Sequence, residues 1–135
     1  MKDELKPNQH SEFSTQNSIL ERSFEFAVRI VKLCRFLEKQ DRVSRTLANQ
    51  LLRSGTSVGA NIEEAQAGQS KSDFIAKMSI SRKEARETLY WLRLLKESDS
   101  VEADKLSEIL KEADELVRIL TAIVKSAQTG GNDAR

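Results

Sequence analysis

Proline is nearly absent from this chain. The only proline among 135 residues is Pro7, and the five glycines all come later. Helices can therefore continue over long stretches without a residue that removes a backbone hydrogen bond. Aromatic residues make up only 5% of the sequence, so a core must be built mainly from Leu, Ile, Val and Ala. That composition favours helices over sheets, and the length suits one domain, so we predict a single all-α domain.

Apolar residues recur with helical spacing in four segments joined by short polar connections. The predicted helices cover residues of about 19–39, 45–67, 71–97 and 101–127. Ser18 with Glu21, Ser44, and Ser70 with Asp73 are the expected N-terminal caps. Residues 18–128 are thus expected to form an antiparallel up-down four-helix bundle. Residues 1–17 and 129–135 are expected to be flexible tails, the first of them disordered and the second beginning just before Gly130-Gly131.

Two glycines, Gly55 and Gly59, lie inside the second predicted helix. A glycine inside a helix costs roughly 0.5–1 kcal/mol relative to Ala, which indicates that close packing of two backbones requires it here. The alternative is a break in the helix at Ser54-Gly55-Thr56.

The first predicted helix carries two apolar stripes on nearly opposite sides. One stripe contains Leu20, Phe24, Ala27, Val28, Val31 and Cys34, and the other contains Ile19, Phe26, Ile30, Leu33 and Leu37. The core of one bundle cannot bury both. The fourth predicted helix, in contrast, gathers its apolar residues in one arc, as an ordinary amphipathic helix does. An apolar stripe on an outer surface indicates an interface, and we favour self-association over a different protein partner.

Polar residues also align on the outer sides of the second and third predicted helices. The first set is Arg53, Ser57, Asn61 and Glu64, and the second is Lys77, Glu84, Glu87 and Trp91, the only tryptophan. Antiparallel pairing places Arg53 level with Glu84 and Glu87. Asn61 and Glu64 then lie level with Lys77. We expect a charge-paired network, either within one subunit or across an interface. The alternative is a solvated surface with exposed ion pairs.

The residue types required for catalysis or metal binding are scarce. His10 is the only histidine and Cys34 the only cysteine, so neither a zinc site nor a Ser-His or Cys-His pair can be assembled. Cys34 fits a small core residue. The stretch RSGTSVGAN lacks the spacing and the lysine of a phosphate-binding loop. We predict a protein without enzymatic activity, cofactor or metal. The chain also lacks a signal peptide and an apolar run of membrane-spanning length, which favours the cytoplasm.

Charge is distributed unevenly along the chain. Residues 18–97 carry a net charge of +5 and residues 98–127 a net charge of −3, within a total of +1. The candidate nucleic-acid contacts are Arg29, Lys32, Arg35 and Lys39 in the first helix, and Arg82, Lys83, Arg86, Arg93 and Lys96 in the third. Repetition around an oligomer would multiply a weak affinity for phosphate groups. The alternative for each residue is an ordinary solvated face.

Residues 51–95, LLRSGTSVGANIEEAQAGQSKSDFIAKMSISRKEARETLYWLRLL, resemble the bacterial four-helix-bundle family. This family is also called the 23S rRNA intervening-sequence protein, or S23-type, family. SFEFAVRIVKL at 23–33 is similar to its first helix, whereas the fourth helix matches only in character. The resemblance implies an antiparallel four-helix bundle that forms homopentamers. The positions that match are Arg53, Ser57, Asn61, Glu64, Glu84, Glu87 and Trp91.

The resemblance also implies two settings for function. Some relatives are encoded inside insertions in the 23S rRNA gene, and a related bundle is an accessory factor of reverse transcriptases in which a basic pentamer contacts nucleic acid and the polymerase. This nearly neutral chain departs from that charge. We therefore expect a non-enzymatic homo-oligomer that binds RNA or a ribonucleoprotein. The alternative is a purely structural or protein-binding assembly, such as an accessory factor of a polymerase or reverse transcriptase.

Overall fold

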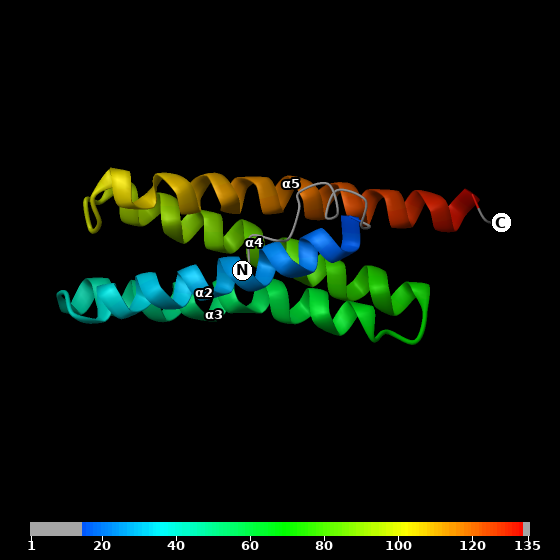
Figure 1. Cartoon of the computed structure of the whole chain (residues 1–135), viewed down its shortest axis with the longest axis horizontal. Coiled ribbons are helices and arrows are strands. Elements are labelled where there is room, and N and C mark those ends of the chain that lie inside the picture. Colours follow the sequence, from blue (N-terminus) through cyan, green and yellow to red (C-terminus); the bar gives the residue numbers. More distant parts are fainter. Residues whose placement is uncertain (1–14, 134–135) are drawn as a thin grey trace, which may run out of the picture.

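The computed structural model describes residues 15–133, and within that range the chain is all-α without strands. Its helices are α2 (Thr15–Glu38), α3 (Arg42–Gln66), α4 (Lys71–Glu97) and α5 (Ala103–Asp133). Figure 1 shows that successive helices run in opposite directions. The predicted antiparallel four-helix bundle is therefore confirmed.

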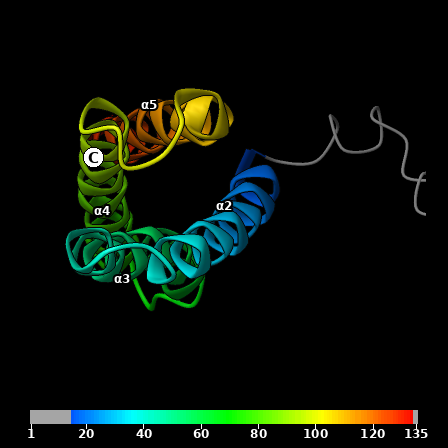
Figure 2. The ribbon, with the colours of Figure 1, turned by 90° about the vertical axis from the view of Figure 1, so that its left-hand side faces the viewer.

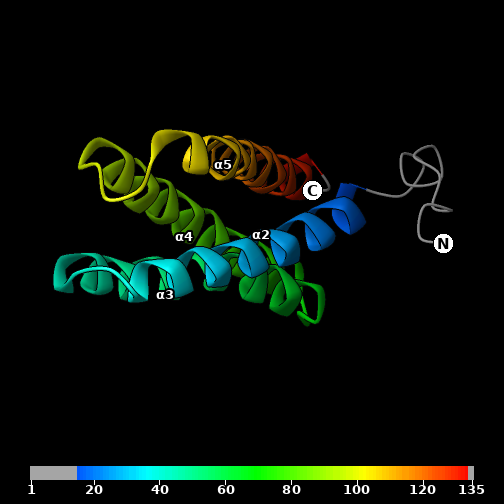
Figure 3. The same cartoon turned by 60° about the vertical axis from the view of Figure 1, so that its left-hand side comes forward.

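The helices pack in chain order around the bundle. Contacts are extensive between α2 and α3, between α3 and α4, and between α4 and α5, whereas α2 contacts α5 only lightly. The end-on view in Figure 2 shows the resulting open arrangement, with α2 and α5 at its two ends. In Figures 1 and 3 the start of α2 lies close to α5, and the rest of α2 diverges from it. Short connections place helices that follow one another in sequence side by side. No such connection joins α2 to α5.

One predicted helix start is correct and two need correction. Ser70 caps α4 by accepting a hydrogen bond from the Asp73 backbone N–H at 3.1 Å, as expected. For α3 the cap is Asp41, whose carboxylate accepts from the Ser44 backbone N–H at 2.8 Å. That hydrogen bond lowers the pKa of Asp41 and leaves Ser44 buried inside the first turn. The first helix begins at Thr15, so Ser18 lies inside α2 and cannot be its cap.

The fourth helix differs from its predicted bounds at both ends. It begins at Ala103 and continues to Asp133, so residues 129–133 are helical and do not belong to a tail. Propagation of an existing helix adds a hydrogen bond for each residue, and Gly130 costs only about 0.5–1 kcal/mol. Residues 1–14 of the predicted N-terminal tail, including His10, lie outside the described residues.

The core is aliphatic, as the composition indicates. Its largest fully buried side chains are Phe26, Ile19, Ile30, Leu37, Leu51, Ile62, Met78, Leu92, Leu95, Leu106, Leu116 and Leu120. Helix α3 is continuous through Gly55, so the alternative of a break there is wrong. A Cβ atom at Gly55 would lie 2.8 Å from Ile30 of α2, and one at Gly59 would lie 3.2 Å from the Ser23 carbonyl oxygen. The two glycines therefore permit α2 and α3 to approach closely.

Small polar residues join α3 to α4 inside the bundle. The Ser81 hydroxyl donates to the Val58 carbonyl at 2.7 Å, and the Thr88 hydroxyl lies 2.8 Å from that of Ser54. Every buried side-chain nitrogen and oxygen of the described residues has a partner, so burial leaves no polar atom unsatisfied there. No helix in the described part of the chain combines the length and apolar character needed to cross a membrane.

Candidate functional site

The outer side of α2 exposes an apolar stripe, as its helical phase predicts. Phe24 is 64% exposed and Val28 39% exposed, and Leu52 of α3 adds a third large apolar side chain at 40%. Beside Phe24 lies a groove of about 420 Å³ between α2 and α3. Its lining residues are Ser23, Phe24, Ala27, Thr56, Gly59, Ala60 and Glu63. Gly59 contributes only backbone to this lining. We call this surface the α2/α3 face.

The second predicted stripe of α2, which contains Phe26 and Ile30, is packed inside the bundle. One residue of the outer stripe is also buried. Cys34, which the helical phase placed with Phe24, is buried beside α3, and its thiol donates to the Ala48 carbonyl at 3.4 Å. Burial raises the pKa of Cys34 from 9.0 to about 11. The predicted role of Cys34 as a small core residue is thus confirmed, but the outer stripe ends before it.

Arg53 of α3 meets Glu84 and Glu87 of α4 within a single chain, at the level that antiparallel pairing predicts. The Arg53 guanidinium contacts Glu84 at 3.3 Å and also binds Glu87. The Trp91 indole N–H donates to the same Glu87 carboxylate at 3.0 Å. Arg53 is half-exposed at 50%, whereas Glu84 is 15% exposed, so these pairs lie at the edge of the bundle. We call this cluster the Arg53 network.

The remaining residues of the two polar stripes extend or border this network. The Ser57 hydroxyl donates to the Arg53 carbonyl at 2.7 Å, and the Asn61 amide donates to the Ser57 carbonyl at 2.9 Å. These bonds follow the axis of α3 and leave the side chains on its outer flank. Glu64 is exposed and Lys77 partly buried, and the structure forms no ion pair between them. The expected pairing at their level is therefore absent between these two described residues.

Sequence reasoning missed the contact that joins α2 to α5. Arg22 donates from Nε to Glu112 at 3.0 Å and from Nη2 to Glu112 and Glu115 at 2.8 and 2.7 Å. The hydrogen bond to Glu112 is the main cause that raises the pKa of Arg22. Farther along, the Lys105 ammonium lies 4.9 Å from the centre of the Phe36 ring. The spacing of Glu112 and Glu115 on one side of α5 was the available signal.

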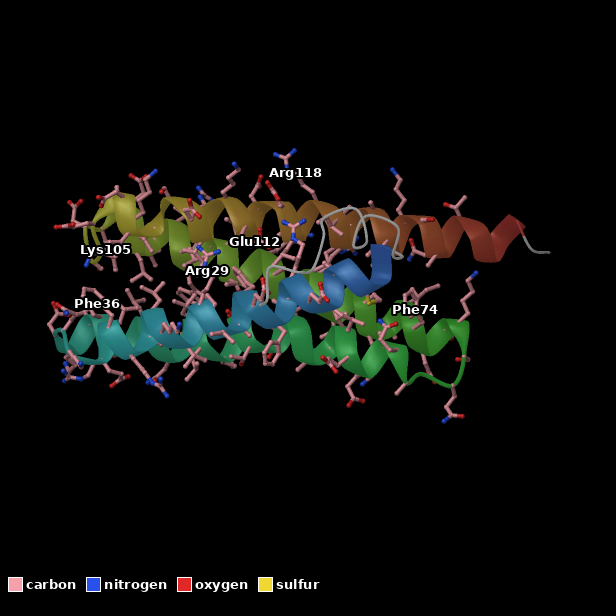
Figure 4. All side chains as sticks on the ribbon, in the orientation of Figure 1. Arg29, Phe36, Phe74, Lys105, Glu112 and Arg118 are labelled. Carbon is pink, nitrogen blue, oxygen red and sulfur yellow. The ribbon has the colours of Figure 1, made fainter. Side chains whose placement is uncertain are left out.

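A second apolar groove lies between α4 and the later part of α5. This groove has a volume of about 530 Å³ and is lined by Phe74, Ile119, Ala122, Ile123, Ser126 and Ala127. Figure 4 shows Phe74 on α4 beneath the later part of α5. All of its lining residues belong to α4 and α5.

The basic candidates on α2 and α4 have different surroundings. Arg29, Lys32, Arg35 and Lys39 are exposed on α2, and Figure 4 shows Arg29 pointing toward the layer that contains α5 and Glu112. On α4, Arg82 is partly buried, whereas Lys83, Arg86, Arg93 and Lys96 are exposed. None of these eight exposed side chains forms an ion pair with another described residue.

In residues 15–133 no group of three or more His, Cys, Asp or Glu side chains is arranged to hold a metal ion. Glu84 and Glu87 flank a common arginine, an arrangement typical of structural pairing. The described surface presents exposed apolar and aromatic side chains together with paired charged groups.

Comparison with known proteins gives a consistent result. A solved structure of a protein of unknown function from the S23 ribosomal protein family of Bacteroides thetaiotaomicron VPI-5482 is 42% identical. The match has a TM-score of 0.76 and covers 83% of this chain and 99% of that one. A search of curated proteins found no match.

The family model described as 23S rRNA-intervening sequence protein matches residues 15–122, which include most of the described helices. With the Arg53 network, the α2/α3 face and the bundle in the same range, the chain belongs to the 23S rRNA-intervening sequence protein family.

Proposed function

We propose that this protein is a non-enzymatic, cytoplasmic homo-oligomer, a homopentamer, which binds RNA or a ribonucleoprotein. The observation that carries the proposal is the α2/α3 face, an apolar groove bordered by a phenylalanine that is 64% exposed. Soluble monomers seldom expose contiguous apolar surface of this kind, whereas interfaces bury it.

The Arg53 network supports the same assembly. It lies on the α3/α4 side of the bundle, next to the side that carries the α2/α3 face (Figure 2). Ile80, 41% exposed, and the partly buried Trp91 add apolar area beside its charges. A neighbouring subunit that covers this area would reduce the screening of the Arg53 ion pairs by water. Because their partners are already present in one chain, such burial leaves no unpaired charge.

The two surfaces differ, and this favours a ring. A two-fold dimer brings the same patch of both subunits together, whereas contact between two different patches repeats head to tail and closes if the rotation permits. We infer that the α2/α3 face of one subunit contacts the Arg53 network side of the next. This geometry is compatible with the homopentamer expected from the family.

RNA binding is supported by the charge pattern. The net charge of +5 between residues 18 and 97 would be repeated around the ring, and repetition strengthens weak phosphate contacts. The family is named for an intervening sequence of 23S rRNA, and the related solved structure is assigned to an S23 ribosomal protein family.

A second candidate is an assembly that binds only protein, such as an accessory factor of a polymerase or reverse transcriptase. The total charge of +1 and the second apolar groove, around Ile119 and Ile123, favour it. Filter binding of structured RNA at low and at physiological salt separates the two. Salt-sensitive binding that persists near physiological ionic strength supports the RNA function, and its absence there supports the protein-binding alternative.

A further inference from the structure

We propose that single-stranded RNA binds along the outward side of α4, where an unpaired base stacks on Tyr90 and phosphates contact Lys83, Arg86 and Arg93. This inference rests on the RNA-binding function proposed above and names the surface and the form of RNA involved. We call these four residues the Tyr90 stripe.

The Tyr90 stripe is continuous and faces away from the bundle. Its residues follow one another at intervals of three, four and three, which places them on one side of a helix. All four are exposed, and Tyr90 is 53% exposed. The core residues of α4, including Ala85, Thr88 and Leu92, lie on the other side. With a rise of about 1.5 Å per residue the stripe spans about 15 Å, which suits a short run of nucleotides.

The aromatic ring in this stripe is held in place. The Tyr90 and Trp91 rings meet edge to face, with centroids 5.1 Å apart and planes inclined by 73°. Trp91 is itself fixed by its hydrogen bond to Glu87. Tyr90 therefore offers a positioned π surface between Arg86 and Arg93, each about one helical turn away. Proteins that bind single strands combine such aromatic platforms with cationic residues that contact the backbone.

The charges of the stripe are available, because Lys83, Arg86 and Arg93 form no ion pair with another described residue. Glu84 and Glu87, the acidic residues nearest in sequence, are both engaged by Arg53. Glu97 shares the helical phase of the stripe but lies one turn beyond Arg93. The candidate basic side chains of α2, which are equally unpaired, lie nearer to acidic groups: Arg29 points toward the layer that contains Glu112 of α5 (Figure 4). Unlike the α2 side chains, the Tyr90 stripe combines its basic residues with an exposed tyrosine ring on the same side of one helix.

The form of the RNA follows from the stacking. Bases in a duplex are stacked on each other and cannot cover a protein ring, whereas loops and single strands expose their faces. The preferred probe is therefore a fluorescein-labelled oligouridylate, and the comparison probe is a fully paired RNA hairpin of equal length.

Fluorescence anisotropy of the full chain with both probes tests the inference. We expect Tyr90→Ser to weaken oligouridylate binding about tenfold and Tyr90→Phe to preserve it, because base–aromatic stacking is worth about 1–3 kcal/mol. Lys83→Gln with Arg86→Gln should weaken binding and reduce the salt slope by about 1.4. The matched control, Arg29→Gln with Lys32→Gln on α2, removes the same charge and should change both quantities less.

Trp91 supplies a second measurement that needs no substitution. It is the only tryptophan and contacts Tyr90, so a base on Tyr90 should change its fluorescence, whereas the paired hairpin should not. If RNA binds but the α4 and α2 variants lose affinity equally and Trp91 fluorescence stays constant, this site is wrong and the RNA function stands. If the unmodified protein binds neither probe near physiological salt, both proposals fail. Sedimentation of each variant shows whether a loss of RNA binding follows a loss of assembly. If it does, the Trp91 fluorescence of the unmodified protein decides whether RNA contacts Tyr90.

Discussion

The outer sides of α2 and α5 differ in what they expose, although both helices bury their inner sides in the same core. On α2 the most exposed large apolar residue is Phe24, next to the groove with α3. On α5 the outer side carries charged residues such as Arg118, which is 76% exposed and pairs with Asp114 one turn away. Within one chain, most of the apolar surface of α5 is therefore buried, whereas α2 keeps a second, exposed apolar side. This difference is the basis of the proposal that a neighbouring subunit covers the exposed side of α2.

The largest effect is expected for Phe24→Asp. If a neighbouring subunit covers Phe24, the substitution buries an unpaired carboxylate and should raise the dissociation constant of the assembly more than about hundredfold. Circular dichroism should show the helices retained, because Phe24 is already largely exposed in one chain. Thr121→Asp on the exposed side of α5 is the control, and sedimentation velocity is the measurement. Equal dissociation of the assembly by both variants would contradict the proposal that Phe24 lies in an interface between subunits.

Next in size are Arg53→Ala and Trp91→Ala. Loss of Arg53 leaves Glu84 and Glu87 without their cation, and loss of Trp91 removes an apolar contact beside them. We expect each to weaken assembly about tenfold or more. Arg118→Ala is the matched control on α5 and should have almost no effect, because exposed pairs contribute about 0–1 kcal/mol. A concentration series in light scattering that gave the same midpoint for Arg53→Ala and Arg118→Ala would contradict the proposal.

A smaller effect within one chain is expected for Arg22→Ala. This change removes the ion pairs between α2 and α5, which are partly exposed, and should lower the free energy of unfolding by about 1 kcal/mol. Urea unfolding in the Phe24→Asp background isolates the effect from assembly. A shift in oligomer dissociation without a change in unfolding would mean that Arg22 acts between subunits instead.

The smallest effect concerns Cys34 and appears only in alkaline solution. Its raised pKa keeps the folded thiol protonated where the unfolded thiol has ionised, so stability should decrease as pH rises above 9.0 toward about 11. At neutral pH the thiol contributes no such change. Iodoacetamide should react slowly with the native protein and with the Phe24→Asp variant alike, and rapidly after unfolding. Fast reaction in the variant would show that the substitution opens the bundle rather than the assembly.

The features that could be predicted from the sequence depend on one helix or on two helices joined by a short connection. Helical phase separated Phe24 from Phe26, and the short connection before α4 fixed the level at which Arg53 meets Glu84 and Glu87. The Ser70 cap followed from local hydrogen bonding.

The features that were missed depend on contacts distant in sequence or on competing local signals. Arg22 meets Glu112 because of how α2 inclines toward α5, and no short connection sets that inclination. At the start of α3 both Asp41 and Ser44 are good caps, and the choice between them depended on where the preceding turn ended. The groove near Ile119 depends on how Phe74 of α4 packs against the later part of α5, which the helical phase of α5 alone does not give.

Sedimentation equilibrium of the full chain at micromolar concentration tests the central claim most directly. The proposal predicts one species of five chain masses, each of 15.3 kDa, which Phe24→Asp converts to single chains and Thr121→Asp does not. A monomer of the unmodified protein at that concentration would contradict the proposal that the α2/α3 face is an interface between subunits.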